Sequence, residues 1–426
     1  MGALTLSNEA VWLIAALATL GVMIRPWGLP EAIWAVAGAI LLVVSSLLPW
    51  RAALAAVAAG TNVYLFLLGM MLLAELARVE GLFDWLAALA VRGARGSPRR
   101  LFTLVYGVGA LVTMLLSNDA TAVVLTPAVY AVARAAEATP LPYLFICAFI
   151  ANAASFALPI SNPANLVVFG NHMPPLASWL GRFALPAAVS IVVTYVVLAA
   201  SSRRTLRGTI ARQIALPPLT PGGRLAAGGI VLTAAVLLGA SSAGVALGLP
   251  TCIAGSLITV LAMLRNPRVL RPLIGGVSWG VLPLVAGLFV LVRGLEHSGV
   301  LRSLGRLLQT EAHRSAYATA WAAGIFTALA CNVANNLPVA LVAGTALKAA
   351  PLTTPLTAPL ANAMLIGVDL GPNLSITGSL ATILWMIALR REGQQISAAR
   401  FLRLGVLVML PALLLSLAAA LLVQHR

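Results

Sequence analysis

The stretch LSNDATAVVLTP, residues 116–127, places three adjacent polar side chains inside an apolar run. A second polar stretch, CNVANNLP at residues 331–338, follows about half a chain later. The two are in register, because Asn336 stands 217 positions after Asp119. A lipid bilayer penalises such residues unless they face a cavity within the protein. Two matched clusters therefore predict one central cavity in a membrane protein that arose by duplication.

The composition supports a polytopic membrane protein. The chain has 426 residues, of which 61% are hydrophobic and 9% charged, whereas soluble domains contain about 25% charged residues. Apolar runs of spanning length recur throughout, which predicts an all-α integral membrane protein. We expect no cleavable signal peptide, because the first apolar run starts after Glu9 without a basic segment before it. The net charge of +16 reflects basic residues in loops between spans, so no nucleic-acid partner is expected.

The pattern of spans repeats after a basic, proline-containing linker at residues 201–224. The first repeat is predicted to occupy residues 1–200 and the second residues 225–426. Each is expected to contain an amphipathic segment, a re-entrant hairpin and a broken helix. The predicted spans lie near 9–24, 30–48, 55–77 and 184–200, then near 225–241, 249–264, 276–292 and 402–423; the amphipathic segments near 81–95 and 297–312; the hairpins near 101–134 and 315–348; and the broken helices near 141–170 and 356–389.

The number of crossings predicts how the repeats are oriented. Each repeat crosses the membrane about five times, because a re-entrant hairpin adds no crossing, and an odd number requires the second repeat to be inverted. If the linker is cytoplasmic, both termini lie outside. That arrangement gives 19 basic residues in the cytoplasm and 8 outside, as the positive-inside rule requires. Arg302, Arg306 and Arg314 do not fit, unless the second amphipathic segment lies flat against the headgroups.

Prolines and polar side chains coincide in both broken helices. The first contains Pro159 and Pro163, and proline interrupts a helix by removing a backbone donor. Non-helical backbone at membrane depth is tolerated where it lines a cavity or is buried in protein. The predicted substrate-binding residues are the amides and hydroxyls at the hairpins and breaks: Ser117, Asn118, Thr121, Asn152, Ser155, Ser161, Asn162, Asn165, Asn332, Asn335, Asn336, Asn373, Ser375, Thr377 and Ser379. Some of these side chains are also expected to cap helices.

Two carboxylates lie within these polar stretches. Asp119 and Asp369 are the predicted proton-coupling residues, because a carboxylate deep in a bilayer is costly and is a candidate for function. Asp369 could instead cap the half-helix that follows it. Glu75 stands three residues before Arg78 near a span end, where an interfacial ion pair is expected.

Neither metal binding nor catalysis is indicated, and no cofactor is expected. The cysteines show no paired spacing, although Cys147 and Cys331 lie close enough to the polar stretches to be weak candidates for contact with a metalloid. An intramembrane protease would need a serine with a histidine base or a metal motif. The four histidines lie away from both clusters, so the chain is not expected to be an enzyme.

These stretches resemble the arsenite permease family of the ArsB type, within a superfamily that also contains sodium/proton antiporters and dicarboxylate carriers. The resemblance extends over nearly the whole chain, and GVDLGPNLSITGSLAT at residues 367–382 is its most specific part. ANAAS at 151–155, with PISNPAN at 159–165, also carries it. Some members of the family have an acid where this chain has Asn152. The resemblance implies an elevator-like motion, in which hairpins and broken helices move against a scaffold of the other spans.

The function implied by the resemblance is export of arsenite and antimonite from the cytoplasm, driven by proton entry across a bacterial inner membrane. Some relatives work with a separate arsenite-stimulated ATPase (ArsA type), which would be a partner. Arsenous acid is a neutral trihydroxide, so it needs hydrogen-bond donors and acceptors rather than an opposite charge. The clusters contain no arginine or lysine, which argues against a dicarboxylate. A sodium/proton antiporter is the alternative, because buried acids and amides could equally hold a cation.

Overall fold

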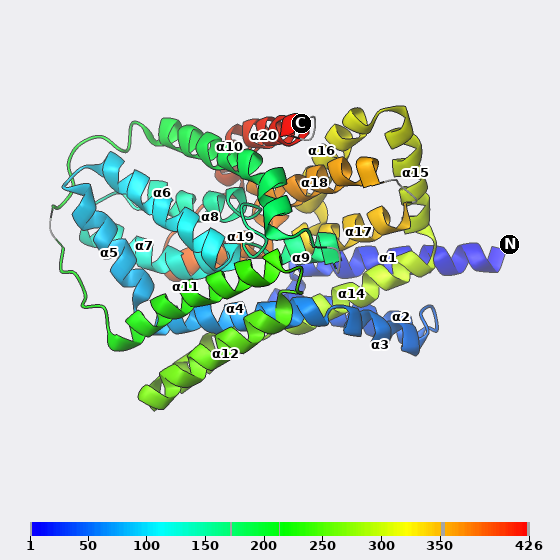
Figure 1. The fold of residues 1–426 in the computed structure, drawn as a ribbon, viewed down its shortest axis with the longest axis horizontal. Coiled ribbons are helices and arrows are strands. Elements are labelled where there is room, and N and C mark those ends of the chain that lie inside the picture. The colour runs from blue at the N-terminus through cyan, green and yellow to red at the C-terminus, as the bar shows by residue number, and fades with distance from the viewer. Residues whose placement is uncertain (1, 171–172, 213, 351–353, 424–426) are drawn as a thin grey trace.

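The computed structural model describes residues 2–170, 173–212, 214–350 and 354–423. These residues form helices joined by loops, with no strand among them (Figure 1). Within the described ranges, eight helical segments are long and apolar enough to cross a membrane. The prediction of an all-α membrane protein is therefore confirmed.

The order of elements in the first half recurs in the second. Helices α1 to α5 are followed by a hairpin (α6, the π-helical turn η2 and α7), a broken helix (α8 and α9) and a long last helix, α10. The second half has α11 to α15, a hairpin (α16 and α17), a broken helix (α18, η5, η6 and α19) and α20. The bounds are α1 Gly2–Ile24, α2 Glu31–Val44, α3 Trp50–Ala59, α4 Thr61–Val79, α5 Leu82–Ala94, α6 Pro98–Leu115, η2 Ala120–Leu125, α7 Thr126–Ala135, α8 Leu141–Ala153, α9 Pro163–Phe169, α10 Leu176–Ser202, α11 Pro221–Ser242, α12 Gly248–Arg265, α13 Leu270–Gly276, α14 Val281–His297, α15 Val300–Arg314, α16 Ala316–Ala334, α17 Asn336–Ala349, α18 Thr354–Leu370, η5 Gly371–Asn373, η6 Ile376–Gly378, α19 Leu380–Arg391 and α20 Ala398–Val423.

Equivalent helices of the two halves run in opposite directions. The rings of Tyr64, at the start of α4, and Phe289, within α14, lie 6.1 Å apart. At the other end of α4, Glu75 lies against Gly276, which precedes α14. The two helices are therefore antiparallel. The amphipathic helices α5 and α15 also lie at opposite ends of the long axis (Figure 1). Both observations fit inverted repeats.

The repeats are interlocked through close helix crossings at equivalent glycines. A Cβ atom on Gly69 of α4 would lie 2.2 Å from the carbonyl oxygen of Thr251 in α12. In the equivalent crossing, a Cβ on Gly287 of α14 would lie 2.7 Å from the carbonyl carbon of Ala35 in α2. Small residues let two backbones approach this closely. Helices α2, α4, α12 and α14 thus form a frame to which both halves contribute.

Several predicted spans differ in detail from the observed helices. The segment predicted near 55–77 is two helices, α3 and α4, which meet at Gly60. The second helix, α2, has only 14 residues. In the first broken helix the interruption is wider than the prolines alone predict, because α8 already ends at Ala153. Propensity alone does not reveal where tertiary contacts replace helical hydrogen bonds.

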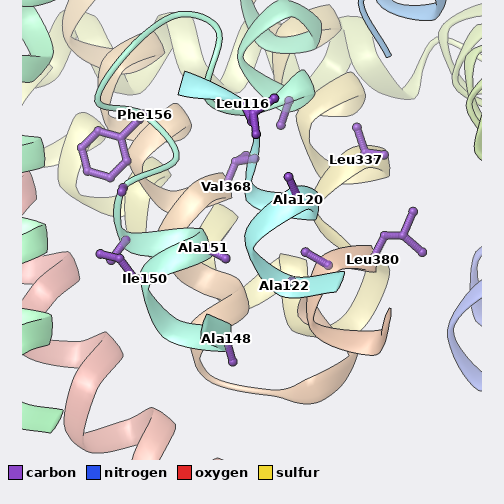
Figure 2. Close-up of a cluster of buried hydrophobic side chains, with 14 of the residues drawn as sticks. Leu116, Ala120, Ala122, Ala148, Ile150, Ala151, Phe156, Leu337, Val368 and Leu380 are labelled. Atoms are coloured by element: carbon purple, nitrogen blue, oxygen red, sulfur yellow. The ribbon is translucent and has the colours of Figure 1, made fainter. Parts of the chain in front are cut away.

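Apolar side chains pack the hairpins and broken helices together. Leu116 and Ala120 of the first hairpin, Leu337 of the second and Leu380 of the second broken helix lie in one buried cluster with Ala148, Ile150 and Ala151 of α8 (Figure 2). The cluster joins elements that are distant in sequence, and it brings the ends of both hairpins to the middle of the molecule.

Candidate functional site

The tip of the first hairpin is shaped by its own polar side chains. Ser117 Oγ accepts a hydrogen bond from the N–H of Ala120 at 3.2 Å, which caps the turn that follows. The N–H of Asn118 donates to the carbonyl of Ser161 at 3.0 Å, so the tip is bonded to the first broken helix. The π-helical turn η2 comes next, and such turns occur often at functional sites.

The second hairpin reverses direction in a shorter turn than the first, because only Asn335 separates α16 from α17. Asn335 has φ 68° and ψ 154°, a conformation that only glycine adopts without strain. Its Oδ1 caps α17 by accepting from the N–H of Leu337 at 3.4 Å. Its Nδ2 donates to the carbonyl of Thr377 at 3.4 Å, in the second break. Both the oxygen and the nitrogen of the Asn335 side-chain amide are therefore hydrogen-bonded, which holds this strained residue in place.

Both breaks are stabilised by amide side chains. Asn165 Nδ2 donates to the carbonyl of Ser155 at 3.0 Å, across the first break. Asn332 Nδ2 donates to the carbonyl of Gly371 at 3.0 Å, and its Oδ1 accepts from Ser375 Oγ at 2.6 Å, in the second break. These residues replace the hydrogen bonds that the interrupted helices lack.

Amides also join the two broken helices to each other. Asn162 Nδ2 donates to Asp369 Oδ1 at 2.5 Å, and Asn152 Nδ2 donates to Asn373 Oδ1 at 3.0 Å. Asn373 Nδ2 donates in turn to the carbonyl of Phe149 at 3.3 Å. All four of these polar side chains are fully or almost fully buried, so the two repeats share one hydrogen-bonded centre.

All four polar elements border a small pocket, which we call the tip pocket. From the first repeat it takes Asn118, Asp119 and Asn162, and from the second Asn336 and Ser379. The frame contributes one residue from α4 and one from α14. The residues lining it are Leu67, Asn118, Asp119, Asn162, Pro163, Val281, Asn336, Leu337, Ser379, Leu380 and Ala381. This lining contains one carboxylate, four neutral polar residues and no cationic side chain.

A larger cavity continues from the tip pocket along α4. The two share Leu67, Asp119, Pro163 and Val281. This cavity, which we call the linker-side cavity, has a volume of about 60 Å³ and extends to Glu75. Its name reflects its position, because Thr220 of the linker hydrogen-bonds to Glu80 at that end of α4. A substrate in the tip pocket would therefore communicate with this side of the molecule.

A separate pocket lies near the opposite end of α4. Its lining includes Asn62, Leu166, Gly170 and Ser241, and none of its lining residues belongs to the tip pocket. One helix thus borders a pocket towards each of its ends, with the tip pocket between them.

The other predicted site residues support the tip pocket rather than line it. Ser117 faces the linker-side cavity, whereas Asp369 is fully buried behind Asn162. Cys147 and Cys331 are buried, and each thiol donates to a backbone carbonyl at 3.7 Å. The supporting group comprises Thr121, Asn152, Ser155, Ser161, Asn165, Asn332, Asn335, Asn373, Ser375 and Thr377. Among the described residues, no three histidine, cysteine or acidic side chains are grouped to hold a metal ion.

The sequence did not predict that residues of the frame helices α4 and α14 line the tip pocket. It also did not predict that Glu75 lines the linker-side cavity. Leu67 and Val281 look like ordinary residues of apolar spans, and only the tertiary packing brings them to the pocket. Glu75 does form the expected ion pair with Arg78. It is nevertheless buried, with 5% of its surface exposed, and it lines the same cavity as Asp119.

Known transporters match most of the chain. Residues 11–367 match the family model CitMHS, described as "Citrate transporter". The "Arsenical pump membrane protein" of Escherichia coli is 30% identical over 357 residues, covering 80% of this chain and 81% of the relative. The protein of the same name from Yersinia enterocolitica is 29% identical over 354 residues, with the same coverage.

A solved structure supports the fold independently. The YdaH transporter of Alcanivorax borkumensis superimposes with a TM-score of 0.56 at 16% identity, covering 88% of this chain and 87% of the other. The overall arrangement of helices is therefore shared with a solved membrane transporter. The chain belongs to the CitMHS family, is related over most of its length to the arsenical pump membrane proteins, and is a membrane transporter rather than an enzyme.

Proposed function

We propose that this transporter exports arsenite, and antimonite as a second substrate, from the cytoplasm of a bacterium in exchange for protons. The observation that carries the proposal is the lining of the tip pocket, which offers neutral donors and acceptors, one carboxylate and no cation. A neutral trihydroxide can be held by amides and hydroxyls. A citrate ion would meet Asp119 without any positive side chain in this lining, and such a like-charge placement disfavours binding.

Asp119 is the residue best placed to exchange protons with solution, because it lines both the tip pocket and the linker-side cavity. Asp369 is the second coupling acid in this proposal. A buried carboxylate is costly unless it is neutralised or fully hydrogen-bonded, and the groups that face Asp369 are neutral: the Asn162 amide, which donates to Oδ1, and the nearby Ser155 hydroxyl. Asp369 would carry its proton in this conformation, while Asp119 exchanges with the cavity.

The proposed motion moves the hairpins and broken helices along α4. The tip pocket lies between the linker-side cavity and the pocket near the opposite end of this helix. With the linker in the cytoplasm, the structure would represent an inward-open state in the inner membrane. Both termini would then lie outside.

The test is arsenite uptake into everted membrane vesicles that contain the protein, with and without a protonophore. We expect uptake that requires an acidic interior and collapses when the protonophore is added. Proteoliposomes given sodium or citrate instead of arsenite provide the comparison. Sodium-dependent proton release without arsenite uptake would replace the proposal with a sodium/proton antiporter, and citrate uptake would replace it with a tricarboxylate carrier.

A further inference from the structure

The linker-side cavity has a counterpart in the second repeat. A groove beside α14 lies between helices α1, α15, α16 and α17, and it is lined by Leu288, Leu291 and Val292 among others. Counted from the equivalent glycines Gly69 and Gly287, Leu288 and Val292 match Met70 and Ala74, which line the linker-side cavity. The two hollows therefore occupy equivalent places in the two repeats.

The two hollows differ in where they carry acids. Counted from the equivalent glycines Gly69 and Gly287, Arg293 replaces Glu75, and the second hairpin has Asn336 where the first has Asp119. The charged residues lining the groove beside α14 are Glu311 and Arg314, which pair with each other on α15 at 2.9 Å. Of the two hollows, the linker-side cavity therefore carries two carboxylates along its length: Asp119 at its inner end and Glu75 towards the linker.

Glu75 is held in a defined position within this cavity. Both of its carboxylate oxygens accept from Arg78 Nε at 3.0 Å. The side chain of Arg78 is 46% exposed while that of Glu75 is 7% exposed, so the ion pair bridges the cavity and the surface. Glu75 lies eight residues after Leu67, which lines the tip pocket. The separation along the helix axis is therefore about 12 Å.

Within the described part of the chain, Asp119 and Glu75 are the two acidic residues that line the linker-side cavity, and Glu75 is the one towards the surface. On its own helix it faces Arg78, and Glu80 beyond it is bonded to Thr220 of the linker. Helix α5 places Asp84 close enough to act on Arg78. The segment from α13 to α14 contributes only uncharged residues to the cavity lining: Gly276, Val277, Ser278 and Val281. Gly276 and Ser278 are exposed, so this end of the cavity reaches the surface.

We propose that Glu75 is a further proton-carrying residue of the exchange, placed between Asp119 and the linker-side solution. This inference rests on the proposed proton-coupled transport. The protonated carboxyl of Asp119 releases its proton into the cavity, where it passes through water to the carboxylate of Glu75. Glu75 then gives the proton to the solution and restores its ion pair with Arg78. The path follows α4 over the roughly 12 Å between Leu67 and Glu75, and the cavity volume of about 60 Å³ is enough for a few water molecules.

The experiment compares two modes of transport in everted vesicles. Uptake driven by a proton gradient requires net proton movement, whereas exchange of labelled for unlabelled arsenite at equal pH does not. For Glu75→Gln we expect gradient-driven uptake to fall at least tenfold and arsenite exchange to stay within twofold of the parent protein. Glu75→Asp should recover part of the gradient-driven uptake. Glu80→Gln is the matched control, because Glu80 lies at the same helix end without lining the cavity, and it should leave both modes unchanged.

Three outcomes separate the possible explanations. Normal gradient-driven uptake by Glu75→Gln overturns the inference. An equal loss of both modes assigns Glu75 a structural role, and also overturns it. If Arg78 left unpaired prevents folding, the double variant Glu75→Gln/Arg78→Gln removes both charges, and retained proton coupling in that variant overturns the inference. Absence of both modes in the parent protein would refute the proposed function itself.

Discussion

The two hairpins have the same construction but not the same chemistry. Each tip is capped by its own polar side chains and bonded to a broken helix of its own repeat. The first tip carries Asp119, and the second carries Asn336 at the equivalent position. The second tip also contains the strained Asn335. Duplication thus supplies two matching walls for one pocket, and later divergence makes only one of them able to take up a proton.

Removing the acid from the first tip tests this difference most directly. Asp119→Asn makes the two tips alike, and proton-driven arsenite uptake should fall to the background of vesicles without the protein. The fold should persist, because neighbouring residues rather than the Asp119 side chain make the capping bonds. Uptake in everted vesicles, with folding checked by size-exclusion chromatography, gives the result. Normal uptake would show that the tips are functionally equivalent.

The second acid is expected to have a smaller effect. In Asp369→Asn the amide oxygen can still accept from Asn162, so the melting temperature should change little. Proton-driven uptake should nevertheless fall by roughly tenfold, which corresponds to about 1.4 kcal/mol in the transport barrier. Asp369→Leu is the contrasting variant. It leaves the buried Asn162 Nδ2 without its partner and should cost about 1–3 kcal/mol of stability. Equal stabilities of the two variants would contradict the assigned hydrogen bond.

The close helix crossings at Gly69 and Gly287 allow the packing of the frame to be compared between the two repeats. Gly69→Ala and Gly287→Ala each place a methyl group against backbone of the other repeat, and overpacking of this kind costs about 1–3 kcal/mol. Gly69→Ala should lower the melting temperature in detergent more, because its nearest contact would be 2.2 Å rather than 2.7 Å. Gly107, whose Cβ would meet nothing within 4 Å, is the control for the intrinsic effect of Gly→Ala. The opposite ranking would show that the repeats are not packed as described.

The smallest expected effect concerns strain at the second tip. Asn335→Gly relieves a conformation that costs about 1–3 kcal/mol in other residues, and glycine is nearly as good as asparagine at the start of a helix. Its melting temperature should match or slightly exceed that of the parent protein. Asn335→Ala keeps the strain and loses the cap, so it should melt earlier than Asn335→Gly. If the alanine variant were the more stable, Asn335 would not be strained in the native state.

The sequence revealed the plan of the fold because its signals are periodic and local. Apolar runs of spanning length, a basic linker and two prolines near the first break predict the series of spans and interruptions. The 217-residue offset between Asp119 and Asn336 predicts the duplication. The separation of α3 and α4 at Gly60 was missed although Gly60, Thr61 and Asn62 mark a turn, because the apolar residues on either side add up to a run of spanning length.

The site was predictable only in part, for a related reason. Asn118, Asp119, Asn162, Asn336 and Ser379 line the pocket, and each is a polar residue that an apolar setting makes conspicuous. The same signal does not separate these residues from Asn152 or Asn373, which bond to each other behind the pocket. Glu75 could be recognised as a buried acid only from tertiary structure, because its spacing from Arg78 is that of an ordinary surface pair.

The hydrogen bond between Asn162 and Asp369 has a consequence for assembly. Each half of the chain holds the polar centre of the other, so neither could complete a binding chamber by itself. A gene divided within the 203–220 connection should yield two inert polypeptides, and arsenite tolerance in a host cell should return only when both are made together. Such mutual dependence would keep two once-identical ancestors joined in one reading frame.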